Sequence, residues 1–211
     1  IFEYTAIFRM NHTAVDNAHI TTAHIYIDAN NTAYKLGHAE GNRTEAREFA
    51  HSEGHTTKAL GQTSHAEGYK SEASGQYSHA EGKGTFAIGT ISHSEGDGTQ
   101  ANGHTSHAEG YRTKTNAEYS HAEGHITEAN GERSHAEGDK SIAEGAGSHA
   151  EGYLTNAQGE HSHAEGHGTI SEGEDSHAEG YHTKAKVYSH AEGYETQANG
   201  AGSHAEGYLT N

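Results

Sequence analysis

Ser64-His65-Ala66-Glu67-Gly68 is a five-residue motif that occurs, with small variations, thirteen times along this chain of 211 residues. Ten copies are complete, and three variants (Gly37–Gly41, Ala50–Gly54 and Ser92–Gly96) keep the His, the Glu and the final Gly. Ten of the twelve steps between successive copies are fourteen residues long, and the other two are thirteen. A fixed period of this length is typical of a solenoid, so we expect each copy to form one turn and the turns to stack as rungs.

The overall composition, taken alone, is typical of a disordered chain. Leu, Ile, Val and Phe make up 20 of 211 residues, and the net charge is −17. We nevertheless infer a folded chain, because disorder does not require particular residue types at fixed positions of a repeat. The acidic balance argues against nucleic acid as a partner. No apolar run approaches the ~20 residues of a membrane-spanning helix, so we expect no membrane insertion. There is no cysteine and therefore no disulfide.

The chain divides into two segments at the first motif. Residues 1–36 contain nine of the twenty large aliphatic and Phe residues and several irregularly spaced Thr-Ala pairs. We interpret them as an N-terminal cap or junction with degenerate rungs, because a solenoid needs its terminal rungs covered. Residues 37–211 form the repeat region, which stops part-way through a repeat, so we expect the chain to be a fragment.

One template describes the repeat region: Ser-His-Ala-Glu-Gly, then x-x-Thr-x-Ala-x-Gly-x-x. We expect two short strands per turn, each ended by a glycine with positive φ. Alternation along a strand places Ser and Ala of the motif on one face and His and Glu on the other. The small residues, including the Thr and Ala of the second strand, suit a narrow interior. The His/Glu face then looks outward, and an outward face that does not vary between repeats is expected to be covered by a partner.

The template resembles the head repeat of the YadA-like trimeric adhesins. Ser78–Gly82, followed by Thr85, Ala87 and Gly89, matches that repeat position by position, with His79 and Glu81 at its Val and Ile. The resemblance implies an all-β fold, a left-handed parallel β-roll with 14-residue turns, in a homotrimer of intertwined or side-by-side chains. In that family the Val and Ile positions face the trimer centre. The His-Ala-Glu version is similar to repeats of tail-fibre-like and surface proteins.

By this resemblance the trimer interface consists of the His and Glu of every motif. We expect a ladder of His–Glu hydrogen bonds, because buried polar groups must be paired. Acidification should loosen such a trimer once the Glu residues are also protonated, since protonated His residues would place like charges in stacked rows. The expected interface residues are His38, Glu40, His51, Glu53, His65, Glu67, His79, Glu81, His93, Glu95, His107, Glu109, His121, Glu123, His135, Glu137, His149, Glu151, His163, Glu165, His177, Glu179, His190, Glu192, His204 and Glu206.

Metal binding is the main alternative for these residues. Imidazoles that converge on a threefold axis beside carboxylates suit Zn²⁺ or Ni²⁺. Thirteen identical sites favour a structural role of these residues over a functional metal site. We therefore expect no required cofactor and at most an adventitious or structural divalent metal. We expect no enzymatic activity and no catalytic residues, because adjacent Ser64 and His65 point to opposite faces of a strand. A Thr face that binds ice is a weaker alternative, since the Thr residues are expected to point inward.

Tyrosines that follow the motif form a second candidate surface, which either packs over the neighbouring rung or faces a ligand such as a glycan. The sequence thus predicts a rigid extracellular stalk or head, in a bacterial surface adhesin or a phage tail fibre, that is a homotrimer and contacts a host-surface receptor or glycan. These tyrosines are Tyr69, Tyr111, Tyr153, Tyr181, Tyr194 and Tyr208.

Overall fold

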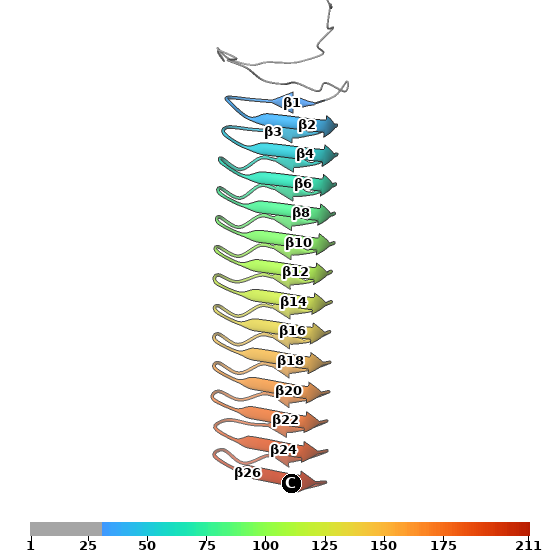
Figure 1. The fold of residues 1–211 in the computed structure, drawn as a ribbon. Helices are drawn as coiled ribbons and strands as arrows, with labels where there is room; N and C mark the ends of the chain where they lie inside the picture. The colour runs from blue at the N-terminus through green and yellow to red at the C-terminus, as the bar shows by residue number, and fades with distance from the viewer. Residues whose placement is uncertain (1–30) are drawn as a thin grey trace, which may run out of the picture.

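The computed structural model describes residues 31–211, and they form one continuous parallel β-solenoid (Figure 1). Each turn contributes one strand to each of two 13-stranded sheets. The predicted all-β solenoid with 14-residue turns is confirmed. Among residues 31–211 there is no helix of the length and hydrophobicity needed to cross a membrane.

The first sheet consists of five-residue strands that begin at the His of each motif. Neighbours pair in register, so that His79 lies beside His93 and Glu81 beside Glu95. These long strands are β2 (His38–Asn42), β4 (His51–His55), β6 (His65–Tyr69), β8 (His79–Lys83), β10 (His93–Asp97), β12 (His107–Tyr111), β14 (His121–His125), β16 (His135–Asp139), β18 (His149–Tyr153), β20 (His163–His167), β22 (His177–Tyr181), β24 (His190–Tyr194) and β26 (His204–Tyr208).

The second sheet consists of two-residue strands. Its first strand falls within the segment expected as a cap, and the rest of that segment, residues 1–30, lies outside the described residues. These short strands are β1 (Thr32–Ala33), β3 (Glu45–Ala46), β5 (Lys58–Ala59), β7 (Glu72–Ala73), β9 (Phe86–Ala87), β11 (Gln100–Ala101), β13 (Lys114–Thr115), β15 (Glu128–Ala129), β17 (Ile142–Ala143), β19 (Asn156–Ala157), β21 (Ile170–Ser171), β23 (Lys184–Ala185) and β25 (Gln197–Ala198).

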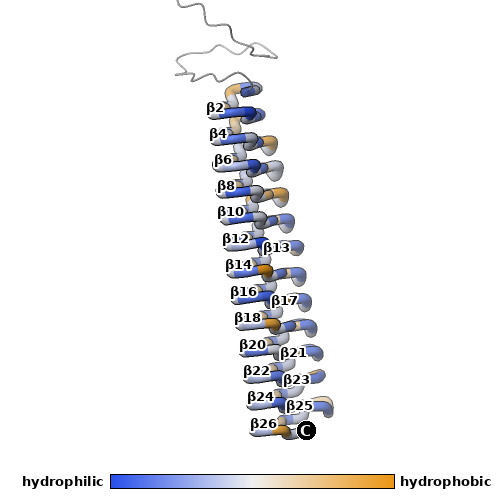
Figure 2. Tube along the Cα trace, turned by 90° about the vertical axis from the view of Figure 1, so that its right-hand side faces the viewer, coloured by the Kyte–Doolittle hydropathy of each residue, from blue (hydrophilic) through white to orange (hydrophobic). Residues whose placement is uncertain are grey.

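The interior between the two sheets holds only small side chains. In the turn that begins at Ser78, the side chains of Ser78, Ala80, Thr85 and Ala87 are 0–2 % exposed, as the alternation predicts. The largest fully buried side chains in the described part of the chain are threonines. The Ser of the motif also holds the corner, because Ser78 Oγ donates a hydrogen bond to the carbonyl oxygen of Gly75 at 2.7 Å. Hydrophobic residues are sparse along the tube and lie on scattered rungs (Figure 2).

The two glycine positions of the template serve different purposes, and the prediction for one of them was wrong. Gly68, which ends the motif, has a φ of +100°, as expected. Gly75, at the other corner, does not have a positive φ, and glycine is needed there because a Cβ would overlap the carbonyl oxygen of Gly89 on the next rung. Positive φ occurs instead at nearby corner residues such as Lys70 (58°) and Tyr77 (57°).

Candidate chain–chain interface

The His and Glu side chains of the motifs all lie on the outer face of the long strands. In β8, His79 and Glu81 are 35 % and 37 % exposed, whereas Ala80 between them is fully buried. In-register pairing repeats this arrangement from rung to rung, which produces a His column and a Glu column along the rod. We call the two columns together the His/Glu face. The structure thus brings the twenty-six residues predicted for the interface together on one surface.

The imidazole rings of the His column stack on one another. From His38 to His163 successive ring centroids are 4.7–4.9 Å apart and the ring planes are within 12° of parallel. The rings tilt farther along, and His190 and His204 meet edge to face at 82°. This spacing equals the distance between paired strands. The stack is therefore a direct consequence of the same residue occupying the same strand position in every turn.

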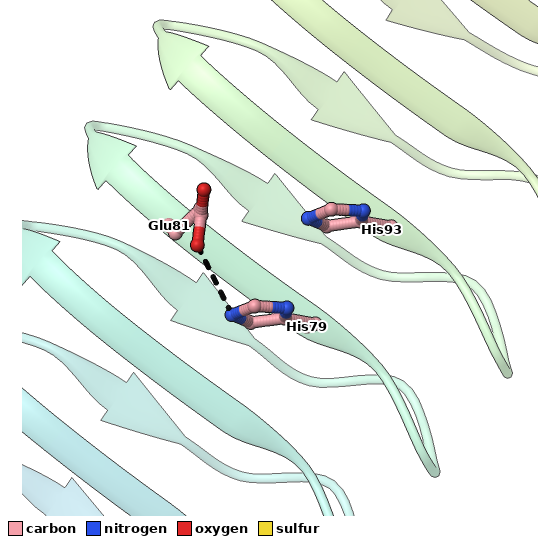
Figure 3. Close-up of side chains that lie close together, drawn as sticks. All are labelled: His79, Glu81 and His93. Carbon is pink, nitrogen blue, oxygen red and sulfur yellow. Dashed lines mark ion pairs between the residues drawn. The ribbon is translucent and has the colours of Figure 1, made fainter.

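The Nε2 atom of the column His is enclosed but has no hydrogen-bond partner. In eleven rungs, from His51 to His190, this atom is inaccessible to solvent and unpaired. In most rungs a carboxylate of the same rung lies nearby: Nε2 of His79 is 3.5 Å from Oε2 of Glu81, and across the rungs where this pair is close the separation is 3.5–3.9 Å. For His135 the Glu123 carboxylate of the preceding rung is closer, at 3.6 Å. A hydrogen bond between such atoms is normally about 2.7–3.2 Å. Figure 3 shows the His79 ring and the Glu81 carboxylate on the same face of β8, with the His93 ring on the adjacent strand.

Burial and crowding lower the pKa of several rings in the His column. Desolvation, followed by the charges of neighbouring His residues, lowers the pKa of six of the rings, and that of His107 falls to about 4. These residues are His51, His79, His107, His135, His149 and His163.

Three successive carboxyl groups of the Glu column, those of Glu109, Glu123 and Glu137, alter one another's pKa. A hydrogen bond with Glu123, together with desolvation, raises the pKa of Glu137 to about 7 and also raises the pKa of Glu109. Glu123, which accepts from both neighbours, has a lowered pKa. These shifts favour neutral imidazoles in the six rungs named above and a partly protonated carboxyl group at Glu137 near neutral pH.

Several sets of three residues on this face place donor atoms within 4.8 Å of one another, for example His79, Glu81 and His93. Two stacked imidazoles cannot both bind one ion in this arrangement. A Zn–N bond is about 2.0–2.1 Å long and lies in the ring plane, whereas an ion midway between two nearly parallel rings with centroids 4.8 Å apart would lie outside both ring planes. One chain can therefore offer one imidazole with carboxylates, either from the same rung, as His79 and Glu81 do, or from adjacent rungs, as His135 and Glu123 do at 3.6 Å.

The predicted Tyr residues occupy the last position of the long strands. Tyr69 and Tyr111 stack on His55 and His125, and near the end of the rod five rings form a continuous stack with centroid spacings of 4.8–5.1 Å. Its members are Tyr153, His167, Tyr181, Tyr194 and Tyr208. The inner rings of this stack have both faces against neighbours, so their edges face the solvent.

Sequence reasoning missed the His residues that share the Tyr position. His55, His125 and His167 follow the motif directly, as the tyrosines do, and a comparison of that position between turns would have found them. It also missed the opposite corner, where Tyr77, Ile91 and other large side chains are about half exposed. The Thr residues on which an ice-binding face would depend lie in the interior, where Thr85 and Thr99 are fully buried.

Comparison with known proteins gives one family. Two copies of the YadA head domain repeat match residues 66–92 and 129–148. No curated protein matches the chain. Both matched stretches lie inside the solenoid and include residues of the His/Glu face, such as His79 and Glu81 in the first and His135 and Glu137 in the second.

Proposed function

Because the chain carries YadA head domain repeats in a parallel β-solenoid with 14-residue turns, we propose that it is a rigid structural segment of a trimeric adhesin or fibre. Three copies associate through the His/Glu face, and each winds as a left-handed β-roll. The segment has a structural rather than a catalytic role. It is located outside the cell, on a bacterial surface appendage or a phage tail fibre.

The observation that carries this proposal is the difference between the two outer faces of the solenoid. On the short strands the outward position holds Lys58, Glu72, Phe86 and Gln100 in successive turns, as a face in contact with water allows. On the long strands it holds His and Glu in every turn. Uniform side chains on a half-exposed surface are explained by an identical environment around each rung, which copies of the same chain supply.

The carboxyl groups of the His/Glu face must be compensated if the face is covered by other chains. Each rung has one carboxyl group, so three chains bring three carboxyl groups to each level of the rod. Because unpaired buried charges are strongly unfavourable, the interface must contain hydrogen bonds, shared protons or cations. The raised pKa values of Glu109 and Glu137 on either side of Glu123 agree with this requirement.

We also propose that the tyrosines at the ends of the long strands contact a receptor or glycan, but not through their flat ring faces. Sugars bind aromatic residues through the flat ring faces, and the stacked rings of Tyr181 and Tyr194 use both faces within the chain. We therefore propose that contacts from these tyrosines use ring edges and phenol hydroxyl groups.

The test is the mass of the particle in solution. The chain has a mass of 22.4 kDa, so a trimer has three times that mass. Sedimentation equilibrium distinguishes the monomer from the trimer. The double variant Glu95→Lys/Glu109→Lys places two cations on the His/Glu face and should shift the protein toward monomers. The control Glu72→Lys/Glu128→Lys makes the same change on the short strands and should stay trimeric. A wild-type monomer, or equal dissociation of both variants, would contradict the proposal.

A further inference from the structure

We propose that the His/Glu face binds divalent transition-metal ions between the chains, through one imidazole nitrogen and one carboxylate oxygen from the same rung of a chain. The ions are of the Zn²⁺ or Ni²⁺ class, which prefer imidazole combined with carboxylate. This inference rests on the trimer proposed above, because a single chain offers two ligands per rung and a neighbouring copy supplies the other two of a tetrahedral ion, with one ion at each level of the rod.

The spacing of the two donor atoms is the first reason. Nε2 of His79 is 3.5 Å from Oε2 of Glu81, and the corresponding pairs of His93 and His107 are separated by 3.6 Å. Two ligands that each lie about 2.1 Å from a tetrahedral ion are about 3.4 Å apart. The separation in these three rungs therefore matches two corners of a zinc coordination sphere, and the other close pairs, at up to 3.9 Å, need a small side-chain adjustment.

The same separation between Nε2 and Oε2 fits a direct hydrogen bond or a bridging water molecule less well. It is longer than a direct hydrogen bond of about 2.7–3.2 Å. A water molecule that bridges both atoms with ordinary hydrogen-bond lengths and angles would hold them about 4.5 Å apart. The gap is too long for a hydrogen bond and too short for a well-aligned water bridge, and a metal ion with bonds of about 2 Å fits between these limits.

The enclosed Nε2 atoms are the second reason. They are sheltered from solvent and have no hydrogen-bond partner in eleven rungs, so their lone pair or N–H group is not engaged within the chain. The stack also fixes the direction of each nitrogen, because rings that lie 4.7–4.8 Å from parallel neighbours cannot turn freely.

Charge is the third reason. Three ionised carboxylates at one level of a trimer would carry a charge of −3, and a divalent cation reduces it to −1 without the need for added protons. Ions in successive rungs would be about 4.8 Å apart, which is wider than the ~3.5–4 Å of two-metal sites. Repeated occupation along the rod is therefore electrostatically acceptable.

The experiment uses the full chain, treated with a chelator, equilibrated with zinc chloride and dialysed against metal-free buffer. Bound zinc is measured by elemental analysis, and sedimentation of the same sample gives the mass. The variant His79→Gln/His93→Gln removes two column imidazoles and should reduce the bound zinc by two ions per trimer. The control His55→Gln/His161→Gln removes two imidazoles outside the column and should leave the bound zinc unchanged.

A second variant protects the test against a folding defect. Glu81→Gln/Glu95→Gln keeps the size of both side chains and should also lose two ions per trimer. Wild-type trimers that retain no zinc, or an equal loss in the control, would overturn the metal inference and leave the proposed trimer intact. A wild-type chain that sediments as a monomer with and without zinc would overturn the proposed function itself.

Discussion

At the scale of single residues, the narrow interior decides which side chains the solenoid accepts. Ala122 and Thr127 are fully buried, and no described interior position holds a side chain larger than Thr. The space is set by the short distance between the two sheets, which the ladders of backbone hydrogen bonds fix in every turn. Added methyl groups therefore have no room except by separating the sheets.

Replacement of Ala122 by Leu tests this constraint. Overpacking of a core typically destabilises by about 1–3 kcal/mol, and we expect Ala122→Leu to reach or exceed that range. The control Lys58→Leu introduces the same side chain at an exposed position of a short strand, where a change within about 0.5 kcal/mol is usual. Urea unfolding monitored by circular dichroism measures both, and equal stability of the two variants would contradict a closely packed interior.

Gly75 and Gly84 are glycines for different reasons: the first because the next rung lies too close for a Cβ, the second because of its backbone conformation. A Cβ on Gly75 would overlap the carbonyl oxygen of Gly89, whereas one on Gly84 (φ +64°) would meet nothing within 4 Å. An L-residue in the left-handed region is unfavourable by roughly 1–2 kcal/mol, and Lys70 already occupies the position corresponding to Gly84. We expect Gly84→Ala to lose at most that amount and Gly75→Ala to lose clearly more, as measured by thermal unfolding. The reverse order would exclude close approach as the reason for Gly75.

At the scale of the elements, the sequence allows the faces of the strands to be predicted but not the side-chain geometry on them. Ser78 and Ala80 alternate with His79 and Glu81, and alternation alone determines which pair is buried. The two-residue length of strands such as Phe86–Ala87 and the positive φ of Tyr77 could not be predicted, because the corner residues vary from turn to turn.

The arrangement of the His/Glu face also goes beyond what the sequence provides. Spacing places His79 and His93 on adjacent strands, and the stacking follows from it. The 3.5 Å gap between His79 and Glu81 depends on side-chain rotamers, which the pattern of residues does not determine. The hydrogen-bonded ladder expected from the sequence stays a prediction for the assembled trimer, since within one chain the pair is too far apart.

The stacked His column makes stability depend on pH. The pKa of His107 is about 4 in the folded chain, against about 6.5 for a free His, and five other rings are shifted in the same direction. Between pH 6.5 and 4 the unfolded chain therefore binds more protons than the folded one. The free energy of unfolding consequently decreases as the pH is lowered through this range. Glu137 opposes this change, because its raised pKa adds stability as pH falls from about 7 toward 4.5.

Since six His are shifted downward and two Glu upward, we expect the melting temperature to decrease from pH 7 to pH 4. Differential scanning calorimetry at constant ionic strength checks this. The variant His107→Gln should show a smaller decrease than the wild type, whereas His161→Gln, outside the column, should follow the wild type. A melting temperature that is constant or rises over this range would contradict a neutral His column.

At the scale of the whole molecule, the rod has one uniform face and several variable ones. Figure 1 shows a straight stack of rungs whose long strands all lie on one side. Repetition along the rod makes every rung contribute equally to an interface, so a small gain per rung adds up over thirteen strands. A long fibre can be held together in this way without a large apolar core.

Association through this face is tested most directly by cross-linking from a single position. The chain contains no cysteine, so Glu109→Cys provides one thiol per chain on the His/Glu face, and Lys114→Cys provides one on the opposite sheet. After treatment with a short bismaleimide, denaturing electrophoresis should show covalent dimers for Glu109→Cys and monomers for Lys114→Cys. Monomers only for Glu109→Cys, or equal cross-linking of both, would contradict an assembly in which three chains meet at their imidazole and carboxyl columns.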